Sequence, residues 1–312
     1  MGSQTPALPR HEHHTLTGHS GPVNIAVYAK GFSKYALSGG NDRTIRLWNP
    51  ELGAEIKAYK GHGYEILGID VTSDNAQFAS SGGDRVAYLW DVTSGQTIRR
   101  FQGHMGKINA VRFGGDGAIL VTASYDRTVK IYDLKAQNRS PIQSLDEASD
   151  SVACVYVSAA EIVTGSVDGH VRTYDIRKGE LRSDYLGHPV TSIRPTKDGS
   201  TYLATTLDSS IRLMDCANGS ALNTFKGHKN DSYRTNATFG FGEARIVCGD
   251  EDGRVWSWDL LTGKPENPNP PPKAHSKTIT WTEQHPTKRD ELLTASADGT
   301  VKVWRHPSPV SS

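Results

Sequence analysis

A strand-turn-strand unit that recurs seven times is the feature of this sequence that most limits how the chain can fold. In the unit at 80–91, Asp84 lies in a tight turn rich in glycine, and Trp90 ends the second strand six residues later. The same spacing recurs six more times, at Asp42 and Trp48, Asp126 and Tyr132, Asp168 and Tyr174, Asp208 and Met214, Asp252 and Trp258, and Asp298 and Trp304. Successive aspartates lie 40 to 46 residues apart. Such a period is typical of the blades of a β-propeller.

The repeat also decides how many domains the chain contains. A chain of 312 residues could form one large domain or two average ones. Seven units of this length fill the chain as a single domain. We therefore assign residues 11–305 to one propeller, residues 1–10 to a flexible N-terminal lead and residues 306–312 to a C-terminal tail.

Composition argues against several function classes. The 35 Lys and Arg residues balance the 34 Asp and Glu residues, so the whole molecule lacks the positive field that drives nonspecific nucleic-acid binding. Cys154, Cys216 and Cys248 form neither a disulfide framework nor a metal-binding spacing. Three histidines near the start have no cluster of carboxylates or cysteines beside them, so a solvated strand explains them better than a metal site; they are His11, His13 and His14. We expect no metal and no cofactor.

The sequence also bears on where the protein is located. The first seventeen residues lack the apolar core of a signal peptide, and no apolar run approaches the ~18 residues of a membrane span. We expect a soluble protein of the cytoplasm and nucleus that does not enter a membrane.

The segment 264–273 contains five prolines, which cannot donate hydrogen bonds to a β-ladder. The outer strand of the sixth blade should therefore be short or absent.

Six of the seven units also begin with a short histidine motif, and a strand follows about four residues after each histidine. The motifs are Gly18-His19, Gly61-His62, Gly103-His104, Gly187-His188, Gly227-His228 and Ala274-His275, while the fourth unit has Glu147-Ala148 at this point. With the Trp-Asp dipeptides at Trp90-Asp91 and Trp258-Asp259, the pattern resembles the WD-repeat β-propeller family over residues 11–305. The resemblance implies an all-β fold of seven four-stranded antiparallel blades. It also implies that residues 13–16 close the ring as the outer strand of the blade formed by residues 279–304.

The resemblance assigns the repeated residues a structural role. In the family, a histidine, a Ser or Thr, an aspartate and a tryptophan form a hydrogen-bonded tetrad, which pairs buried polar groups. The matching sets are His19, Asp42 and Trp48; His62, Asp84 and Trp90; His104 and Asp126 with Tyr132; His228, Asp252 and Trp258; and His275, Asp298 and Trp304. A hydrolase triad is the alternative, but the set recurs in blade after blade and no nucleophile lies in a strained elbow.

Blades four to six depart from this pattern. Blade four lacks the histidine, blade five has Ala204 and Met214 at the hydroxyl and aromatic positions, and blade six has Cys248 at the hydroxyl position. We therefore expect blades four to six to be the looser part of the ring.

The resemblance also implies a partner-binding face, formed by the loops after the histidine motifs and by the aspartate turns. Placing residues by these offsets predicts the candidates Arg43, Tyr64, Glu65, Arg85, Lys107, Tyr125, Arg127, Asp231 and Glu251. Blades one to three would carry a basic part of the face, and blades four to six an acidic part with Glu147, Asp150 and Asp250. A basic surface suits an acidic peptide, a phosphorylated segment or an RNA backbone. The alternative is that each arginine merely covers its own turn.

Several segments resemble one member of the family more closely, namely 61–65, 144–150, 165–187, 207–215, 225–233 and 251–260. This resemblance implies a monomeric, non-enzymatic scaffold that binds several proteins of a mitogen-activated protein kinase cascade. The alternative is a protein subunit of the spliceosome, bound to splicing factors, that contacts RNA only within the larger particle. An enzyme is disfavoured, since the sequence offers no nucleophile, metal cluster or phosphate-binding loop.

Overall fold

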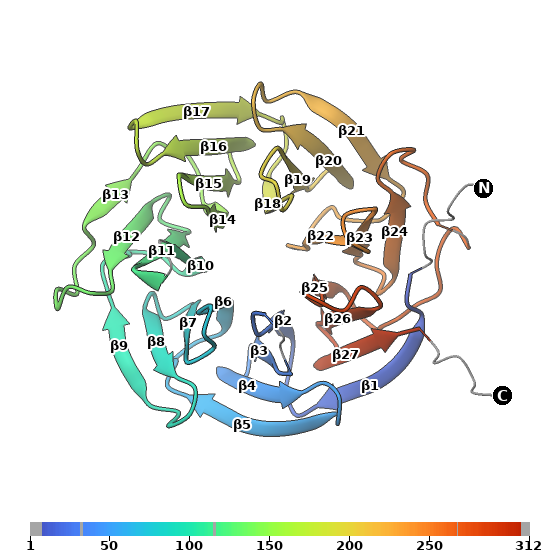
Figure 1. Cartoon of the computed structure of the whole chain (residues 1–312), viewed down its shortest axis with the longest axis horizontal. Helices are drawn as coiled ribbons and strands as arrows, with labels where there is room; N and C mark the ends of the chain where they lie inside the picture. Colours follow the sequence, from blue (N-terminus) through green and yellow to red (C-terminus); the bar gives the residue numbers. More distant parts are fainter. Residues whose placement is uncertain (1–7, 32–33, 115–116, 267, 307–312) are drawn as a thin grey trace.

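Seven small β-sheets are arranged in a ring around a central axis in the computed structural model, which describes residues 8–31, 34–114, 117–266 and 268–306 (Figure 1). Six sheets have four strands and the sixth blade has three among the described residues, and the strands within each sheet pair antiparallel. The predicted all-β, seven-bladed propeller is therefore confirmed. No helix among the described residues is long and apolar enough to cross a membrane.

The strands of blades one to three run from the axis outward in chain order. They are β2 (Val23–Tyr28), β3 (Ala36–Gly40), β4 (Thr44–Asn49) and β5 (Ala54–Lys60) in blade one; β6 (Ile66–Val71), β7 (Gln77–Gly82), β8 (Ala87–Asp91) and β9 (Thr97–Phe101) in blade two; and β10 (Ile108–Gly114), β11 (Ile119–Ser124), β12 (Val129–Asp133) and β13 (Gln143–Leu145) in blade three.

Blades four to seven repeat this order with two exceptions, in blade six and in the last strand of the ring. The strands are β14 (Val152–Val157), β15 (Glu161–Ser166), β16 (His170–Asp175) and β17 (Glu180–Tyr185) in blade four; β18 (Val190–Pro195), β19 (Thr201–Thr206), β20 (Ser210–Asp215) and β21 (Ala221–Lys226) in blade five; β22 (Ala237–Gly240), β23 (Arg245–Gly249) and β24 (Val255–Asp259) in blade six; and β25 (Ile279–Gln284), β26 (Glu291–Ser296), β27 (Thr300–Arg305) and β1 (His11–Thr17) in blade seven.

Burial follows from the position of each strand in its blade. The inner strands lie between two neighbouring blades, so β3 and β26 are buried along their whole length. The outermost strands face solvent on one side, and β5 and β21 each bury a single residue, Tyr59 and Phe225. These aromatic rings pack against the next blade: the ring centroids of Tyr59 and Trp90 are 6.1 Å apart, and those of Phe225 and Trp258 are 6.4 Å apart. Each outer strand therefore covers the core of the blade that follows it.

Blade seven closes the ring by combining both ends of the propeller. Strand β1 pairs with β27, with Leu16 opposite Val301, as the sequence predicts. An ion pair of 2.7 Å between Lys302 and Glu12 joins the same two strands. Closure leaves only short sheet edges, which protects a β-protein against edge-to-edge aggregation.

Blade six has no fourth strand among its described residues, which leave out residue 267. After β24 the chain makes only two isolated bridges to it, Trp258 with Pro265 and Arg254 with Lys273. The prolines between these bridges cannot donate to the ladder. The predicted loss of this strand is confirmed.

The chain ends lie partly outside the described residues. Residues 1–7 of the predicted lead and 307–312 of the predicted tail fall there, so the flexibility of these segments stays a prediction. The last part of the lead packs on blade six, where Leu8 is only 6% exposed and its amide donates to both carboxylate oxygens of Glu266 at 3.1 Å.

Candidate functional site

One face of the ring is built from the seven aspartate turns and from the seven loops that precede the inner strands; we call it the aspartate-turn face. In every blade a backbone amide of the turn donates to a carbonyl of the loop at 2.8 to 3.0 Å. The seven bonds run from Asn41 to Pro22, Gly83 to Glu65, Tyr125 to Lys107, Val167 to Ser151, Leu207 to Pro189, Glu251 to Lys229 and Ala297 to Thr278. Turn and loop therefore form one continuous surface in each blade.

Blades one, two and seven hold this surface with a complete side-chain network. In blade two, Nδ1 of His62 lies 2.8 Å from the Asp84 carboxylate and Nε2 lies 2.7 Å from Ser80 Oγ, to which Trp90 Nε1 donates at 2.8 Å. Blade one repeats the network with His19, Asp42, Ser38 and Trp48, and blade seven with His275, Asp298, Thr294 and Trp304. The hydroxyl accepts from the indole and can donate to Nε2, so Nδ1–H faces the carboxylate.

Burial and the hydrogen bonds of the network shift the pKa values of its aspartate and histidine side chains. Burial acts to raise the pKa of Asp84, but the hydrogen bonds from His62 and from the Gly63 amide hold it below its ordinary value. Burial lowers the pKa of His19 against the opposing effect of Asp42. Burial therefore disfavours a charged His19, and hydrogen bonds favour an ionised Asp84.

Blade three lacks only the tryptophan. His104 lies 2.8 Å from Asp126 and 2.7 Å from the Thr122 hydroxyl, while the Tyr132 hydroxyl donates to the Gln102 carbonyl at 3.3 Å. The loop and the turn are thus joined by the histidine, as in the complete networks.

Blades four and five hold the turn aspartate with an arginine of the same hairpin. In blade four, Arg172 Nη2 donates to Asp168 at 2.8 Å and Nη1 donates to Ser166 Oγ at 2.8 Å. In blade five, Arg212 Nη2 donates to Asp208 at 2.6 Å. Burial opposes ionisation of Asp208, but the hydrogen bonds of Arg212 and Thr206 lower its pKa to about 2.

The loops of blades four and five are correspondingly less restrained by side chains. His188 of blade five is half-exposed, and its Nε2 lies 3.8 Å from Asp208. In blade four, only Ser149 reaches from the loop to the turn aspartate, through its amide at 2.9 Å and its hydroxyl at 3.1 Å. An arginine within the hairpin thus stabilises the turn, and the loop is joined to the turn by the backbone bond and, in blade four, by Ser149.

Blade six corrects the sequence assignment of His228, Asp252 and Trp258 to a tetrad. Asp250 holds the turn instead, since its buried carboxylate accepts from Trp256 Nε1 at 2.6 Å and from the Arg254 amide at 2.7 Å. Asp252 is exposed and its amide donates to Asp250. The cause is Cys248, whose thiol stands where the other blades carry the bridging hydroxyl or, in blade five, an alanine.

His228 is left buried without a hydrogen bond. Neither of its ring nitrogens has a partner, and its ring packs edge-on against Trp258 with centroids 5.3 Å apart. Burial lowers the pKa of His228 to about 4. The Trp258 indole donates to the Lys226 carbonyl at 3.1 Å. This histidine therefore packs as an apolar group.

Large apolar side chains stand out from the aspartate-turn face. The exposed fractions are 60% for Tyr64, 60% for Tyr125, 82% for Met105 and 58% for Tyr233. The structure brings two predicted pairs together: the Arg43 guanidinium lies 5.9 Å from the Tyr64 ring centroid, and Lys107 Nζ lies 5.6 Å from that of Tyr125. Exposed aromatic rings beside cations are the composition of interaction hot spots.

Three of the predicted arginines occupy a backbone conformation that favours glycine. Arg43, Arg85 and Arg127 follow the turn aspartate with φ of 64°, 64° and 70°. Three other blades place glycine at this point, namely Gly169, Gly253 and Gly299, and blade five has Ser209. A left-handed conformation costs a side-chain-bearing residue roughly 1–2 kcal/mol. An exposed arginine kept at this cost in three successive blades points to a use for its side chain.

The acidic part of the face differs from the prediction. Glu251 Oε1 accepts the amides of Asp231, Ser232 and Tyr233 at 2.8, 2.6 and 3.0 Å, so this carboxylate holds the loop that presents Tyr233. Asp250 is buried and contributes no surface charge. Of the remaining acidic candidates, Asp231 is exposed and accepts from Ser209 Oγ at 2.6 Å, and Glu65 is half-buried and accepts Gly83 through its carbonyl.

Groups that could support other chemistry occupy structural positions. The described residues contain no group of three or more His, Cys, Asp or Glu side chains placed to hold a metal ion. Burial raises the pKa of the Cys154 thiol to about 11, far from that of a reactive thiolate. His13 and His14 lie at the ring closure, where they contact Arg305 and the Glu51 carbonyl.

Comparisons with known proteins agree with this architecture. The family model described as WD domain, G-beta repeat matches residues 10–49, 53–91, 95–133 and 272–305. The chain is 51% identical to an uncharacterized WD repeat-containing protein of Schizosaccharomyces pombe, over 91% of this chain and 95% of that protein. It is 47% identical to WD repeat domain-containing protein 83 of Homo sapiens, over 96% and 93%. The corresponding homolog of Dictyostelium discoideum is 34% identical, over 93% and 96%.

Proposed function

The chain belongs to the WD-repeat family of protein-interaction propellers, and we propose that it is a non-enzymatic scaffold that assembles mitogen-activated protein kinase signalling components on its aspartate-turn face. A rigid ring with seven loop-and-turn pairs can present different side chains to several partners at once. Its partners are kinase-cascade proteins of the cytoplasm and nucleus.

The observation that carries this proposal is the group of exposed side chains on blades one to three. Tyr64, Met105 and Tyr125 are all at least 60% exposed on one face, and the turns of the same three blades carry the exposed Arg43, Arg85 and Arg127. Rigid aromatic side chains lose little conformational entropy on binding, and aromatic and arginine residues supply most of the energy of protein interfaces. The face therefore has the composition of a partner-binding surface.

The signalling role rests on a closer likeness. Segments 61–65, 144–150 and 225–233 resemble mitogen-activated protein kinase organizer 1, and the likeness includes Glu147-Ala148 in place of a Gly-His pair. A spliceosomal subunit is the second candidate. It is favoured by the three arginines at the turns, which suit a ribonucleoprotein, while the net charge of +1 limits RNA contact to a larger particle.

Affinity purification from separate nuclear and cytoplasmic extracts distinguishes the two candidates. The signalling proposal predicts recovery of kinase-cascade proteins from the cytoplasmic extract. Recovery of splicing factors alone, from the nuclear extract alone, would replace it with the spliceosomal role.

The binding face is tested by a triple variant, Tyr64→Ala with Arg85→Glu and Arg127→Glu. It should lower partner recovery at least tenfold, because two positive charges are reversed and a large ring is removed on one surface. The matched control is Tyr35→Ala with Arg177→Glu and Lys178→Glu, whose residues lie in turns at the other ends of the strands and are exposed. Equal recovery by both variants, with both folded, would mean that another surface binds the partners.

A further inference from the structure

The outer strands of five blades repeat one packing feature; in blade four Asp184 stands at the same position, opposite Val171, and the described residues of blade six form no outer strand. In five blades a leucine, tyrosine or phenylalanine of the outer strand pairs with the residue three positions after the turn aspartate. These pairs are Leu16 with Val301, Tyr59 with Ile45, Phe101 with Ala87, Leu145 with Val129 and Phe225 with Ile211. All five side chains are buried. The register thus defines a fixed position that an apolar side chain fills.

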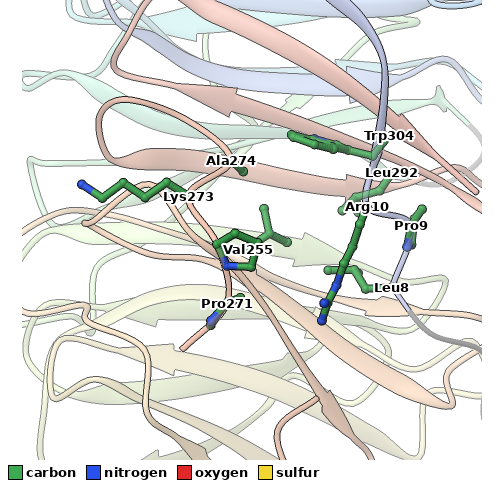
Figure 2. Close-up of a pocket in the computed structure, with 10 residues that line it drawn as sticks. Leu8, Pro9, Arg10, Val255, Pro271, Lys273, Ala274, Leu292 and Trp304 are labelled. Atoms are coloured by element: carbon green, nitrogen blue, oxygen red, sulfur yellow. The ribbon is translucent and has the colours of Figure 1, made fainter. Parts of the chain in front are cut away.

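In blade six the equivalent residue is Val255, and a pocket lies beside it. In the described part of the chain, no strand pairs with the outer edge of β24 at Val255. The isolated bridge at this end of β24 joins the preceding residue, Arg254, to Lys273. The pocket has a volume of about 110 Å³. Figure 2 shows the side chains around it. They come from the N-terminal stretch Leu8 to Arg10, from Val255 and the stretch Pro271 to Ala274, and from Leu292 and Trp304 of the next blade.

Trp304 has a direct equivalent in other blades. The rings of Tyr59 and Phe225 cover Trp90 and Trp258, the tetrad-position tryptophans of the following blades. Trp304 is 8% exposed, whereas Trp48, Trp90 and Trp258 are 2% exposed or less. Leu8 shares the core cluster of Trp304 and Val255, so it covers part of the site and also lines the pocket. The pocket therefore lies where an outer-strand side chain would complete the core.

Size and charge narrow the choice of occupant. A cavity of roughly 150 Å³ takes up benzene, so a pocket of about 110 Å³ suits a leucine better than a larger aromatic side chain. Two cations, Arg10 and Lys273, belong to its lining, and both are exposed. The Glu266 carboxylate lies 3.5 Å from both Arg10 and Arg245 and accepts the Leu8 amide, and the described residues of the lining itself include no carboxylate. The rim is therefore positive overall and favours an acidic segment.

We propose that the pocket between blades six and seven binds a leucine side chain from an acidic, extended segment of a partner protein. The leucine packs against Val255 and Trp304, and flanking carboxylates face Arg10 and Lys273. This site lies at the outer edge of β24, beside the aspartate turn of blade six, where the Ala274 amide donates to the Gly253 carbonyl at 2.8 Å. None of its lining residues belongs to the exposed group on blades one to three, so it adds a second docking surface that does not depend on the proposed signalling role.

The probe is a fluorescently labelled synthetic decapeptide with the sequence of residues 141–150, Pro-Ile-Gln-Ser-Leu-Asp-Glu-Ala-Ser-Asp. This segment carries the outer-strand leucine of blade three, followed by three carboxylates. Fluorescence anisotropy should show binding that weakens with added salt. A control peptide with serine in place of the leucine should bind at least tenfold more weakly, because the leucine supplies the apolar contact.

Two variants of the protein test the location. Ala274→Leu fills the pocket from its lining and should weaken binding at least tenfold. Lys273→Glu changes only an exposed charge and should weaken it about threefold. Lys60→Glu is the matched control: Lys60 is exposed on the outer strand of blade one, which is complete, so binding should be unchanged. Thermal unfolding verifies that each variant is folded.

Five results would overturn the proposal. The serine peptide could bind as tightly as the leucine peptide, or Ala274→Leu and Lys273→Glu could both leave the affinity unchanged. Concentration-dependent self-association that Ala274→Leu abolishes would identify a second copy of the chain as the occupant. A tenfold gain in peptide affinity on deletion of residues 1–7 would identify the chain's own N-terminal segment. Loss of peptide binding in Tyr64→Ala would place the peptide on the aspartate-turn face.

Discussion

The seven blades fall into two groups that differ in how the turn aspartate is held. Blades one, two, three and seven use a histidine that reaches from the preceding loop, as His62 does toward Asp84. Blades four and five use an arginine of the same hairpin, and blade six uses the Trp256 indole on a different aspartate, Asp250. The WD-repeat family model matches segments in the first group alone. The side-chain network and the fold are therefore separable, since all seven blades keep the same backbone bond between turn and loop.

The difference has a mechanical consequence for the aspartate-turn face. A histidine joins two segments that are distant in sequence, whereas Arg172 and Asp168 are four residues apart within one hairpin. The turn is stabilised in both groups, but a histidine restrains the loop only in the first; in the second, Ser149 of blade four and Glu251 of blade six join loop and turn by other hydrogen bonds. The exposed aromatic and arginine side chains of blades one to three thus stand on the more firmly held loops, which suits preorganised binding.

The largest effect on stability is expected from His62→Phe in blade two. The phenyl ring removes the hydrogen bonds of His62 to the half-buried Asp84 carboxylate and to the buried Ser80 hydroxyl. The carboxylate keeps the bond from the Gly63 amide, and the hydroxyl keeps the bond from the Trp90 indole. This loss should lower the free energy of unfolding by about 3 kcal/mol at pH 7. Urea denaturation of the variant and of the wild type measures the difference. A loss below about 1 kcal/mol would mean that the histidine network does not restrain this blade.

Arg172→Ala in blade four should cost less, about 2 kcal/mol at pH 7. Asp168 then loses its bidentate partner but keeps the bonds from Ser149 and from the His170 amide. Arg172→Lys should restore only part of the loss, because an ammonium cannot donate in the same fork geometry. The same denaturation measurement checks both variants, and full rescue by lysine would show that charge alone holds the turn.

His228→Phe in blade six should have the opposite sign to His62→Phe. His228 is buried without hydrogen bonds, so an apolar ring should raise the free energy of unfolding by about 1 kcal/mol at pH 7.

The gain from His228→Phe should grow as the pH falls. The pKa of His228 is about 4 in the folded chain and its ordinary value is 6.5, so the unfolded chain binds the extra proton between these values. The wild type should lose about 2 kcal/mol through this group between pH 7 and pH 5, and the variant should be spared that loss. Melting temperatures at both pH values test this. A constant difference would contradict the low pKa.

The smallest effect is expected from Asp252→Ala, because this exposed residue contributes its amide and not its carboxylate to the turn. Its free energy of unfolding should stay within about 0.5 kcal/mol of the wild type. Asp250→Ala, which removes the partner of Trp256, should cost at least 1 kcal/mol. If the two costs were reversed, the original assignment of Asp252 to the blade-six network would be correct.

The sequence predicted the features of the fold that the repeat encodes. The spacing of aspartate and aromatic residues located all seven blades, the family offset predicted that β1 closes the ring, and five prolines predicted the missing strand of blade six. These features depend on backbone pattern and on proline chemistry, which are local properties of the sequence.

The replacement networks could not be predicted from spacing. Arg46 of blade one stands four residues after its turn aspartate, as Arg172 and Arg212 do, but pairs with Glu55 because His19 already occupies Asp42. Which carboxylate the arginine pairs with depends on the packing of the neighbouring loop. Tyr233 was missed for a similar reason, since its exposure depends on how Glu251 holds the longer loop of blade six.

Site-resolved amide hydrogen exchange of the folded protein tests the division between the two groups most directly, because the amides compared make the same backbone bond in every blade. The amides of Asn41, Gly83, Tyr125 and Ala297 should exchange at least tenfold more slowly than those of Val167 and Leu207 in the two arginine blades. Such a difference would establish that the histidine networks restrain loop and turn together. Equal protection at these six amides would contradict it.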